Sequence, residues 1–365
     1  GRLHPRPPPP SRHAGRTPHP PPNHHAHPTP TRCGCVRAGF GGWGIAFWWG
    51  GRVVGRLVVI PTAEELAGWT LERQHPLTRT WVDDVRRLAI LAEEHAALDI
   101  LLAEDLDIAA TRAQRLAPGK PAESMLNRWV AVGNDLGVMF SMRFENMNLD
   151  RPFVDATPMT RSPEPDDLPA IATAARDYYG IHQPLYVRLW TADAGVDGTL
   201  PDRRFLGAPI SELQPYDVPP GLALRRTSTV DHYDAARRAY ASVDADHPHH
   251  VEEATLQDLD DLQESAADGL LYDVTVNGEW AGYAAAIIKP DDALGLPAYV
   301  VRELVLAPEH RGHGYGRHLS TLLAQSLPDP TRILIGTIHS ANHGARTAAL
   351  KAGRQDVGGW LQLPL

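Results

Sequence analysis

The residues with the most chemical content lie between positions 299 and 317. The apolar, β-branched run Tyr299–Leu306 predicts a buried strand, which Pro308 ends. A glycine-rich turn follows at residues 311–316, and the apolar-periodic run from His318 predicts a helix. A strand, a glycine-rich turn and a helix N-terminus together can bind phosphate, because free N–H groups and the helix dipole face the anion.

Spacing excludes two common nucleotide motifs in this stretch. A G-x-G-x-x-G fingerprint would place its last glycine on Arg317 or Leu319, depending on the register. A P-loop requires a lysine after its second glycine, and the stretch contains no lysine. The alternative to a phosphate site is a glycine-rich turn that binds no ligand.

Glu303 is the acid within the otherwise apolar strand. Burial would raise the pKa of its carboxyl toward neutrality, which is the range that a general base needs. The alternative is a structural glutamate that pairs with Arg302 or Arg311.

Composition and charge limit the partners of the chain. At 365 residues the chain is long enough for two domains, and it carries a net charge of −9. Residues 1–57 contain eight arginines and no acid, so residues 58–365 carry −17. We therefore expect a cationic partner such as an amine, and no nucleic acid.

The cysteines and the apolar segments indicate the compartment. Cys33 and Cys35 are the only cysteines, so we expect no disulfide framework, and this suits a reducing cytoplasm. Nearby histidines do not complete a convincing ligand set, so we expect no metal. The apolar patch at residues 38–51 is too short and glycine-rich to span a membrane, and no membrane partner is expected.

Composition divides the chain into three parts. Residues 1–58 are rich in Pro, His, Arg and Gly, and we expect them to be a disordered or wrongly assigned leader. Residues 59–222 predict an α+β lobe that ends in a Pro/Gly-rich connector at 192–222. Residues 223–365 predict a second domain with the element order α-α-β-β-β-α-β-α-β.

This element order and the loop resemble a known family. Arg311, Gly314 and Gly316 fill the pattern R-x-x-G-x-G, and Glu303-Leu-Val-Leu-Ala-Pro308 precedes it. Residues 223–365 therefore resemble the GNAT N-acetyltransferase superfamily. The resemblance implies an α+β, three-layer fold with a mixed sheet between helices, and acetyl-CoA as co-substrate.

The resemblance also implies roles for individual residues. Glu303 takes the place of the general base, and an amide near Val305 polarises the thioester carbonyl. The implied cofactor-binding residues are Leu304, Val305, Leu306, Arg311, Gly312, His313, Gly314, Tyr315, Gly316 and Asn342.

Two positions depart from the family pattern. Ala349 stands where the family usually has a Tyr that protonates the leaving thiolate, and Arg354 stands where it has Phe. His339, at the end of the next predicted strand, could replace the missing Tyr.

The implied activity is acetyl transfer to a primary amine of a small molecule or peptide. One alternative is a module that binds acetyl-CoA without turnover, for which the missing Tyr argues. Another is a pair of lobes that bind no CoA, against which the intact loop argues. The sequence predicts neither the acceptor nor the oligomeric state.

A shift of 146 positions aligns the predicted elements of the two halves. Residues 153–159 fall on 299–305, and the predicted helix 166–179 falls on 312–325. The first half is therefore either a degenerate GNAT-like lobe or an unrelated α+β domain. Its loop Arg161-Ser-Pro-Glu-Pro-Asp166 has no glycine and two acids, so we expect a single active site, in the C-terminal half.

Overall fold

The computed structural model describes residues 56–57, 59–133, 135–290 and 294–365. They belong to one compact unit, Arg52–Leu365. The expected leader lies outside the described residues, apart from a two-residue strand at Arg56–Leu57.

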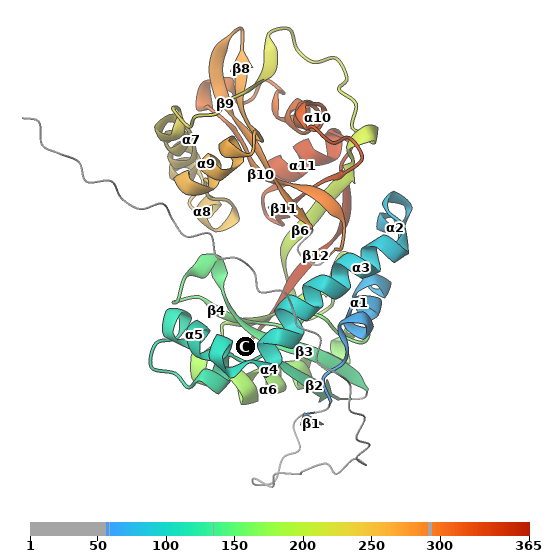
Figure 1. The fold of residues 1–365 in the computed structure, drawn as a ribbon. Coiled ribbons are helices and arrows are strands. Elements are labelled where there is room, and N and C mark those ends of the chain that lie inside the picture. Colours follow the sequence, from blue (N-terminus) through green and yellow to red (C-terminus); the bar gives the residue numbers. More distant parts are fainter. Residues whose placement is uncertain (1–55, 58, 134, 291–293) are drawn as a thin grey trace, which may run out of the picture. The chain divides into compact units, whose positions relative to one another are not determined.

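The described chain is built around one sheet of twelve strands (Figure 1). The strands are β1 Arg56–Leu57, β2 Arg128–Val132, β3 Leu136–Phe144, β4 Pro152–Asp155, β5 Tyr186–Thr191, β6 Leu200–Pro209, β7 Leu222–Arg226, β8 Leu271–Val276, β9 Glu279–Pro290, β10 Pro297–Leu306, β11 Ile333–His339 and β12 Gln355–Pro364. Parallel and antiparallel pairs both occur, so the sheet is mixed.

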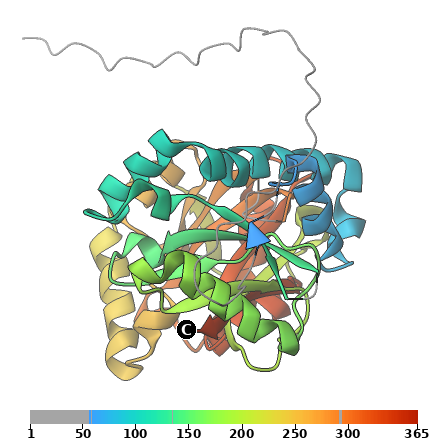
Figure 2. The same ribbon diagram turned by 90° about the horizontal axis from the view of Figure 1, so that it is seen from below.

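Helices cover both faces of this sheet. They are α1 Ala63–Glu72, α2 Thr78–Trp81, α3 Asp84–His95, α4 Leu101–Glu104, α5 Leu106–Leu116, α6 Leu168–Tyr179, α7 Tyr233–Asp246, α8 His250–Glu253, α9 Leu259–Ala267, α10 Gly316–Ser326 and α11 His343–Lys351. Helices α7 and α9 pack on one side of β8–β10, and α10 packs on the other (Figure 1). In the N-terminal half, α1 and α3 lie on one side of the strands and α6 lies on the other (Figure 2). The expected α+β fold with a mixed sheet between helices is confirmed.

The strands follow the same order from either edge of the sheet when β7–β12 are matched to β1–β6. It runs β1-β2-β3-β4-β5-β12-β6-β11-β10-β9-β8-β7. Each of the first six strands in the chain thus has a counterpart six strands later, in the mirrored position. The pairing types agree as well, because β4–β5 and β10–β11 are parallel, whereas β5–β12 and β11–β6 are antiparallel.

The predicted connector at residues 192–222 is wrong in its central part. Residues Leu200–Pro209 form β6, which lies between β11 and β12 in the middle of the sheet. Its pairing with β11 covers the whole of β11, from Ile333 to His339. The chain thus places a strand from before residue 222 between two strands from after it.

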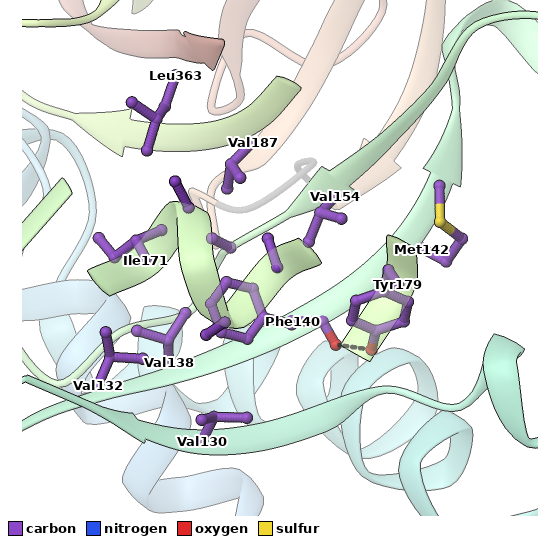
Figure 3. Packing of buried hydrophobic residues seen from close by; sticks show 14 of the residues in the cluster. Val130, Val132, Val138, Phe140, Met142, Val154, Ile171, Tyr179, Val187 and Leu363 are labelled. Atoms are coloured by element: carbon purple, nitrogen blue, oxygen red, sulfur yellow. Dashed lines mark hydrogen bonds between the residues drawn. The ribbon is translucent and has the colours of Figure 1, made fainter. Parts of the chain in front are cut away.

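A large apolar core supports the N-terminal half of the sheet (Figure 3). Val130, Phe140 and Met142 of β2 and β3 and Ile171 of α6 are fully buried in it. The hydroxyl of Tyr179, at the end of α6, donates to the backbone carbonyls of Leu126 and Phe140 at 2.8 and 3.0 Å. The buried phenol is therefore hydrogen-bonded, as a polar group in a core must be.

Candidate functional site: a glycine loop beside a buried carboxyl

Strands β10 and β11 pair over only a short distance and then separate. Ala298–Val300 pair with Ile333–Ile335, and no further register pairs follow between them. Both strands nevertheless continue, β10 to Leu306 and β11 to His339. Over these last residues, the backbone of β10 that faces away from β9 has no pairing partner in β11.

The glycine-rich turn follows directly at the end of β10. Gly312 and Gly314 have φ values of +77° and +78°, which side chains rarely adopt, and an added Cβ at either position would meet open space. Among the described residues, the N–H groups of Gly312, Gly314 and Tyr315 donate to no protein acceptor. The turn therefore presents free backbone donors.

The N-terminus of α10, which begins at Gly316, is equally open. No side chain caps it, and its first turn contains no acid. The corresponding end of α6 is different, because the carboxylate of Asp167 accepts the N–H of Glu164 at 2.8 Å and an ion pair from Arg161 at 2.7 Å. An anion could thus bind at α10, whereas carboxylates already lie at the start of α6.

The arginines of the loop do not point freely toward this anion site. Arg311 Nε donates to the carbonyl of Leu306 at 2.9 Å, and its two other nitrogens reach α7. Arg317 Nε donates to His318 Nε2 at 3.0 Å. The rings of His313 and Tyr315 stack on each other, with centroids 5.7 Å apart.

Glu303 lies after a bulge in β10, and its side chain is buried, with 4% of the residue exposed. Its Oε1 accepts from the hydroxyl of Tyr240 at 2.7 Å and from the N–H of Leu304 at 3.0 Å, and its Oε2 accepts from the N–H of Gln257 at 3.2 Å. Burial raises the pKa of Glu303 to about 7, although the three hydrogen bonds oppose the shift. This carboxyl can therefore exchange a proton near neutral pH.

The main chain of β10 alternates in direction at the site. Ala307 N–H donates to Ala281 of β9 at 2.8 Å, and alternation along an antiparallel pair turns Val305 toward β9 as well. Leu304 and Leu306 then face the side where β10 and β11 separate. The N–H of Leu304 already donates to Glu303 Oε1, so the N–H of Leu306 is the donor better placed than that of Val305 to meet a ligand in that gap.

The remaining predicted residues follow β11. Asn342 caps α11 through its Oδ1, which accepts the N–H of Ala345 at 3.1 Å. His339 Nδ1 accepts the N–H of Ala341 at 3.2 Å, so Nε2 is the ring nitrogen that this bond leaves available. Ala349 is buried, and the guanidinium of Arg354, also buried, donates to the carbonyls of Leu206 and Gly336.

The sequence reasoning did not identify Tyr240 and Gln257 as parts of the site. They lie 63 and 46 residues from Glu303, and no local pattern connects them to the strand. Tyr240 sits at an ordinary position of an amphipathic helix, so its sequence context resembles that of a core residue.

Comparison with known families identifies this part of the chain. Residues 231–353 match the family described as "Acetyltransferase (GNAT) family". The C-terminal half of the chain belongs to the GNAT superfamily. The match contains the glycine loop, Glu303 and Asn342, so the geometry described above lies within a GNAT domain, whose family carries out acyl transfer.

Several solved structures are similar to the chain. A GCN5-related N-acetyltransferase from Sphaerobacter thermophilus is 13% identical, and the match covers 74% of this chain and 92% of that one with a TM-score of 0.44. A GCN5-related N-acetyltransferase from Kribbella flavida is 14% identical, with 72% and 96% covered and a TM-score of 0.41. A tandem GNAT protein from the clavulanic acid biosynthesis pathway is 14% identical, with 83% and 95% covered and a TM-score of 0.33. No curated protein matches the chain.

In the part of the chain that the structure describes, no helix is both long enough and apolar enough to cross a bilayer. Nor do the described His, Cys, Asp and Glu side chains form a group of three or more that could hold a metal ion. Cys33 and Cys35 lie outside the described residues.

Proposed function

We propose that the chain is an acetyl-CoA-dependent N-acetyltransferase that acts on a primary amine of a small molecule or peptide. The observation that carries the proposal is the combination of an open phosphate-type loop and a buried carboxyl with a pKa of about 7 on one strand-loop-helix unit. The first binds a pyrophosphate, and the second accepts a proton near neutral pH. The cysteine content favours a reducing, cytoplasmic setting.

In this proposal the backbone N–H groups of residues 312–316 bind the pyrophosphate of acetyl-CoA. The unpaired edge of β10, through the carbonyl of Leu304 and the N–H of Leu306, hydrogen-bonds the pantetheine arm. A donor on this edge also polarises the thioester carbonyl, which gains negative charge as the amine attacks. Asn342, at the start of α11, is a further contact to the arm.

Glu303 takes the proton from the ammonium form of the acceptor. Its carboxyl is buried beneath Tyr240, so the proton passes through an ordered water. The neutral amine nitrogen then attacks the thioester carbonyl and forms the C–N bond, the C–S bond breaks, and CoA leaves as a thiolate. The second proton of the attacking nitrogen passes to solvent water as the amide forms. A thiol pKa of roughly 8.5 makes the thiolate a reasonable leaving group even without the usual Tyr.

His339 is a candidate to protonate the thiolate in place of that Tyr. It could donate only as an imidazolium, because a neutral imidazole is too weak an acid for this step. Protonation of Nδ1 would break the hydrogen bond from Ala341 N–H. We therefore propose solvent as the first proton source and His339 as the second.

We propose two GNAT-like lobes, residues 59–222 and 223–365, of which only the second binds acetyl-CoA. The mirrored strand order supports two lobes, and it implies that each contributes its last strand, β6 or β12, to the other. Asp167 and Glu164 at the start of α6 argue against a pyrophosphate there. The ion pair between Asp155 and Arg188 also ties β4 to β5 where their pairing ends.

The alternative is a module that binds acetyl-CoA without turnover. The burial of Glu303 and the small side chain at Ala349 favour it, because no acid or base then reaches the reactants directly. Both functions need the loop, and only the first needs Glu303.

Glu303→Gln separates the two functions. We expect its acetyl-CoA affinity, measured by calorimetry, to equal that of the wild type. CoA release with a panel of primary amines should fall by about 10²–10⁴-fold, the usual effect of losing a general base. Gly314→Asp, which places a carboxylate in the loop, should abolish binding.

Two results would contradict the proposal. If the wild type binds acetyl-CoA but releases no CoA with any amine, the chain is a binding module. If Gly314→Asp binds acetyl-CoA as tightly as the wild type, the loop is not the pyrophosphate site.

A further inference from the structure

We propose that Arg311 is a positioning residue, which clamps the glycine loop to α7 and thereby holds the hydroxyl of Tyr240 against Glu303. The inference rests on the proposed function. It gives Arg311, the first residue of R-x-x-G-x-G, a role in positioning the groups around the general base Glu303 rather than in binding the phosphates. It makes the loop and the base parts of one rigid unit.

Arg311 makes three hydrogen bonds within the protein. Its Nε donates to the carbonyl of Leu306, at the end of β10, at 2.9 Å. Its Nη2 donates to the carbonyl of Ala239 at 3.0 Å, and its Nη1 donates to Ser242 Oγ at 3.4 Å. A guanidinium has five N–H donors in a fixed plane, so it can connect three acceptors that a lysine could not reach together.

These acceptors flank Tyr240. Ala239 and Ser242 lie on either side of it in one turn of α7, and Tyr240 donates to Glu303 Oε1 at 2.7 Å. Arg311 and Glu303 therefore hold the same helical turn from two points on one strand-loop segment. If the turn moves away from β10, both contacts open together.

Other charged and titratable groups surround this carboxyl. Tyr233 of α7 interacts with Glu303, and Asp244 and Arg311 interact with Tyr240. His250 of α8 packs its ring against that of Tyr240 and pairs with Asp244 at 2.7 Å. The preceding Arg302 is held by α9, where its Nη1 lies 2.8 Å from a carboxylate oxygen of Glu264 and 2.5 Å from the carbonyl of Asp261.

Loss of the Tyr240 hydrogen bond should raise the proton affinity of Glu303. The bond stabilises the charged carboxylate, so its removal raises the pKa of Glu303 above about 7. Removal of one hydrogen bond to a charged acceptor shifts a titration by about one pH unit. In a turnover assay, the same change would lower kcat/KM about tenfold on the acid side.

The test follows the titration of Glu303 by NMR in protein labelled with ¹³C at the glutamate carboxyl. The signal is assigned by its absence in Glu303→Gln. Tyr240→Phe, Arg311→Ala, Arg311→Lys and the double variant Tyr240→Phe/Arg311→Ala are compared with the wild type. Arg237→Ala, which removes an exposed arginine from the same helix, is the matched control.

The positioning role predicts three results. Tyr240→Phe and Arg311→Ala each move the midpoint up by about one pH unit. The double variant moves it no further than Tyr240→Phe alone, because Arg311 acts through Tyr240. Arg311→Lys, which keeps the charge and the fold but not the clamp, moves the midpoint as well, and Arg237→Ala does not.

Other results would overturn the inference. If Arg311→Lys has the wild-type midpoint, and if the shifts of Tyr240→Phe and Arg311→Ala add in the double variant, Arg311 acts only through its charge. An unchanged midpoint in Tyr240→Phe would mean that its hydroxyl does not stabilise the carboxylate. The titration uses no ligand, so a wild type that fails to bind acetyl-CoA would refute the proposed function separately.

Discussion

Cutting the chain between Tyr216 and Asp217 tests whether β6 is a structural part of the C-terminal half. Tyr216 is 81% exposed, so the cut falls in an accessible segment between β6 and β7. The pieces, residues 59–216 and 217–365, then carry β6 and its neighbours β11 and β12 on different chains.

The missing strand should cost piece 217–365 most of its stability. The whole of β11 is paired with β6, and Phe205 and Leu206 of β6 are at most 3% exposed. Burial of these two side chains contributes about 3–6 kcal/mol, and the backbone groups of β11 and β12 would lose their partners as well. Because a domain is stable by only about 5–15 kcal/mol in total, piece 217–365 alone should not hold its fold.

The assay compares each piece alone with the two pieces expressed together. We expect the pair to co-elute from a sizing column and to unfold in a single urea transition followed by circular dichroism. Piece 217–365 alone should show no cooperative transition. The reasoning is refuted if piece 217–365 alone unfolds cooperatively with a free energy close to that of the intact chain.

Four further predictions follow from the site. The pH profile of kcat/KM should fall below pH about 7, where Glu303 becomes protonated; a flat profile from pH 5 to 8 would exclude this base. The pKa of Glu303 in the folded state lies above its ordinary value of 4.5, because the folded protein binds the proton of this carboxyl more tightly than the unfolded chain does. This tighter binding stabilises the fold fully below pH 4.5, and the stabilisation is lost as pH rises through 7. The unfolding free energy of Glu303→Gln minus that of the wild type, measured in urea, should therefore be about 3 kcal/mol larger at pH 8 than at pH 4. The same difference between variant and wild type at both pH values would contradict the pKa shift. Gly282→Ala should destabilise the chain by more than about 2 kcal/mol, because its Cβ would lie 1.9 Å from the carbonyl oxygen of Val305, and an unchanged thermal midpoint would contradict this geometry. Calorimetry should give one acetyl-CoA per chain, because Asp167 already lies at the start of α6, and a second site would show that this helix end is open.

The sequence was most informative where chemistry and local structure coincide. The loop at residues 311–316 and the base candidate Glu303 could be found because glycines, an arginine and a lone acid stand at fixed spacing around one strand. The order of elements in residues 223–365 was largely readable, because the strands there are apolar and the helices are periodic. The prediction omitted strand β7, Leu222–Arg226, and the short helix α8.

Strand β6 could not be predicted because its sequence does not resemble a central strand. It carries Arg203, Arg204 and two prolines. The charge of Arg204 is neutralised by Asp356, which is 152 residues away and lies 2.8 Å from it. Only the folded chain brings this partner close, so the local pattern of β6 is that of a loop.

The contacts of Arg311 were missed for a related reason. Its position in R-x-x-G-x-G suggests a phosphate ligand, whereas two of its three acceptors lie about 70 residues earlier, on α7. A motif specifies which residue is required, and the fold decides what that residue touches.

The position of β6 also affects how such a chain can change during evolution. The first half cannot be discarded, because its strand β6 lies between β11 and β12 of the second half. Selection for a stable second half would then maintain residues 200–209. Related chains should therefore vary freely around the start of α6 and much less along β6.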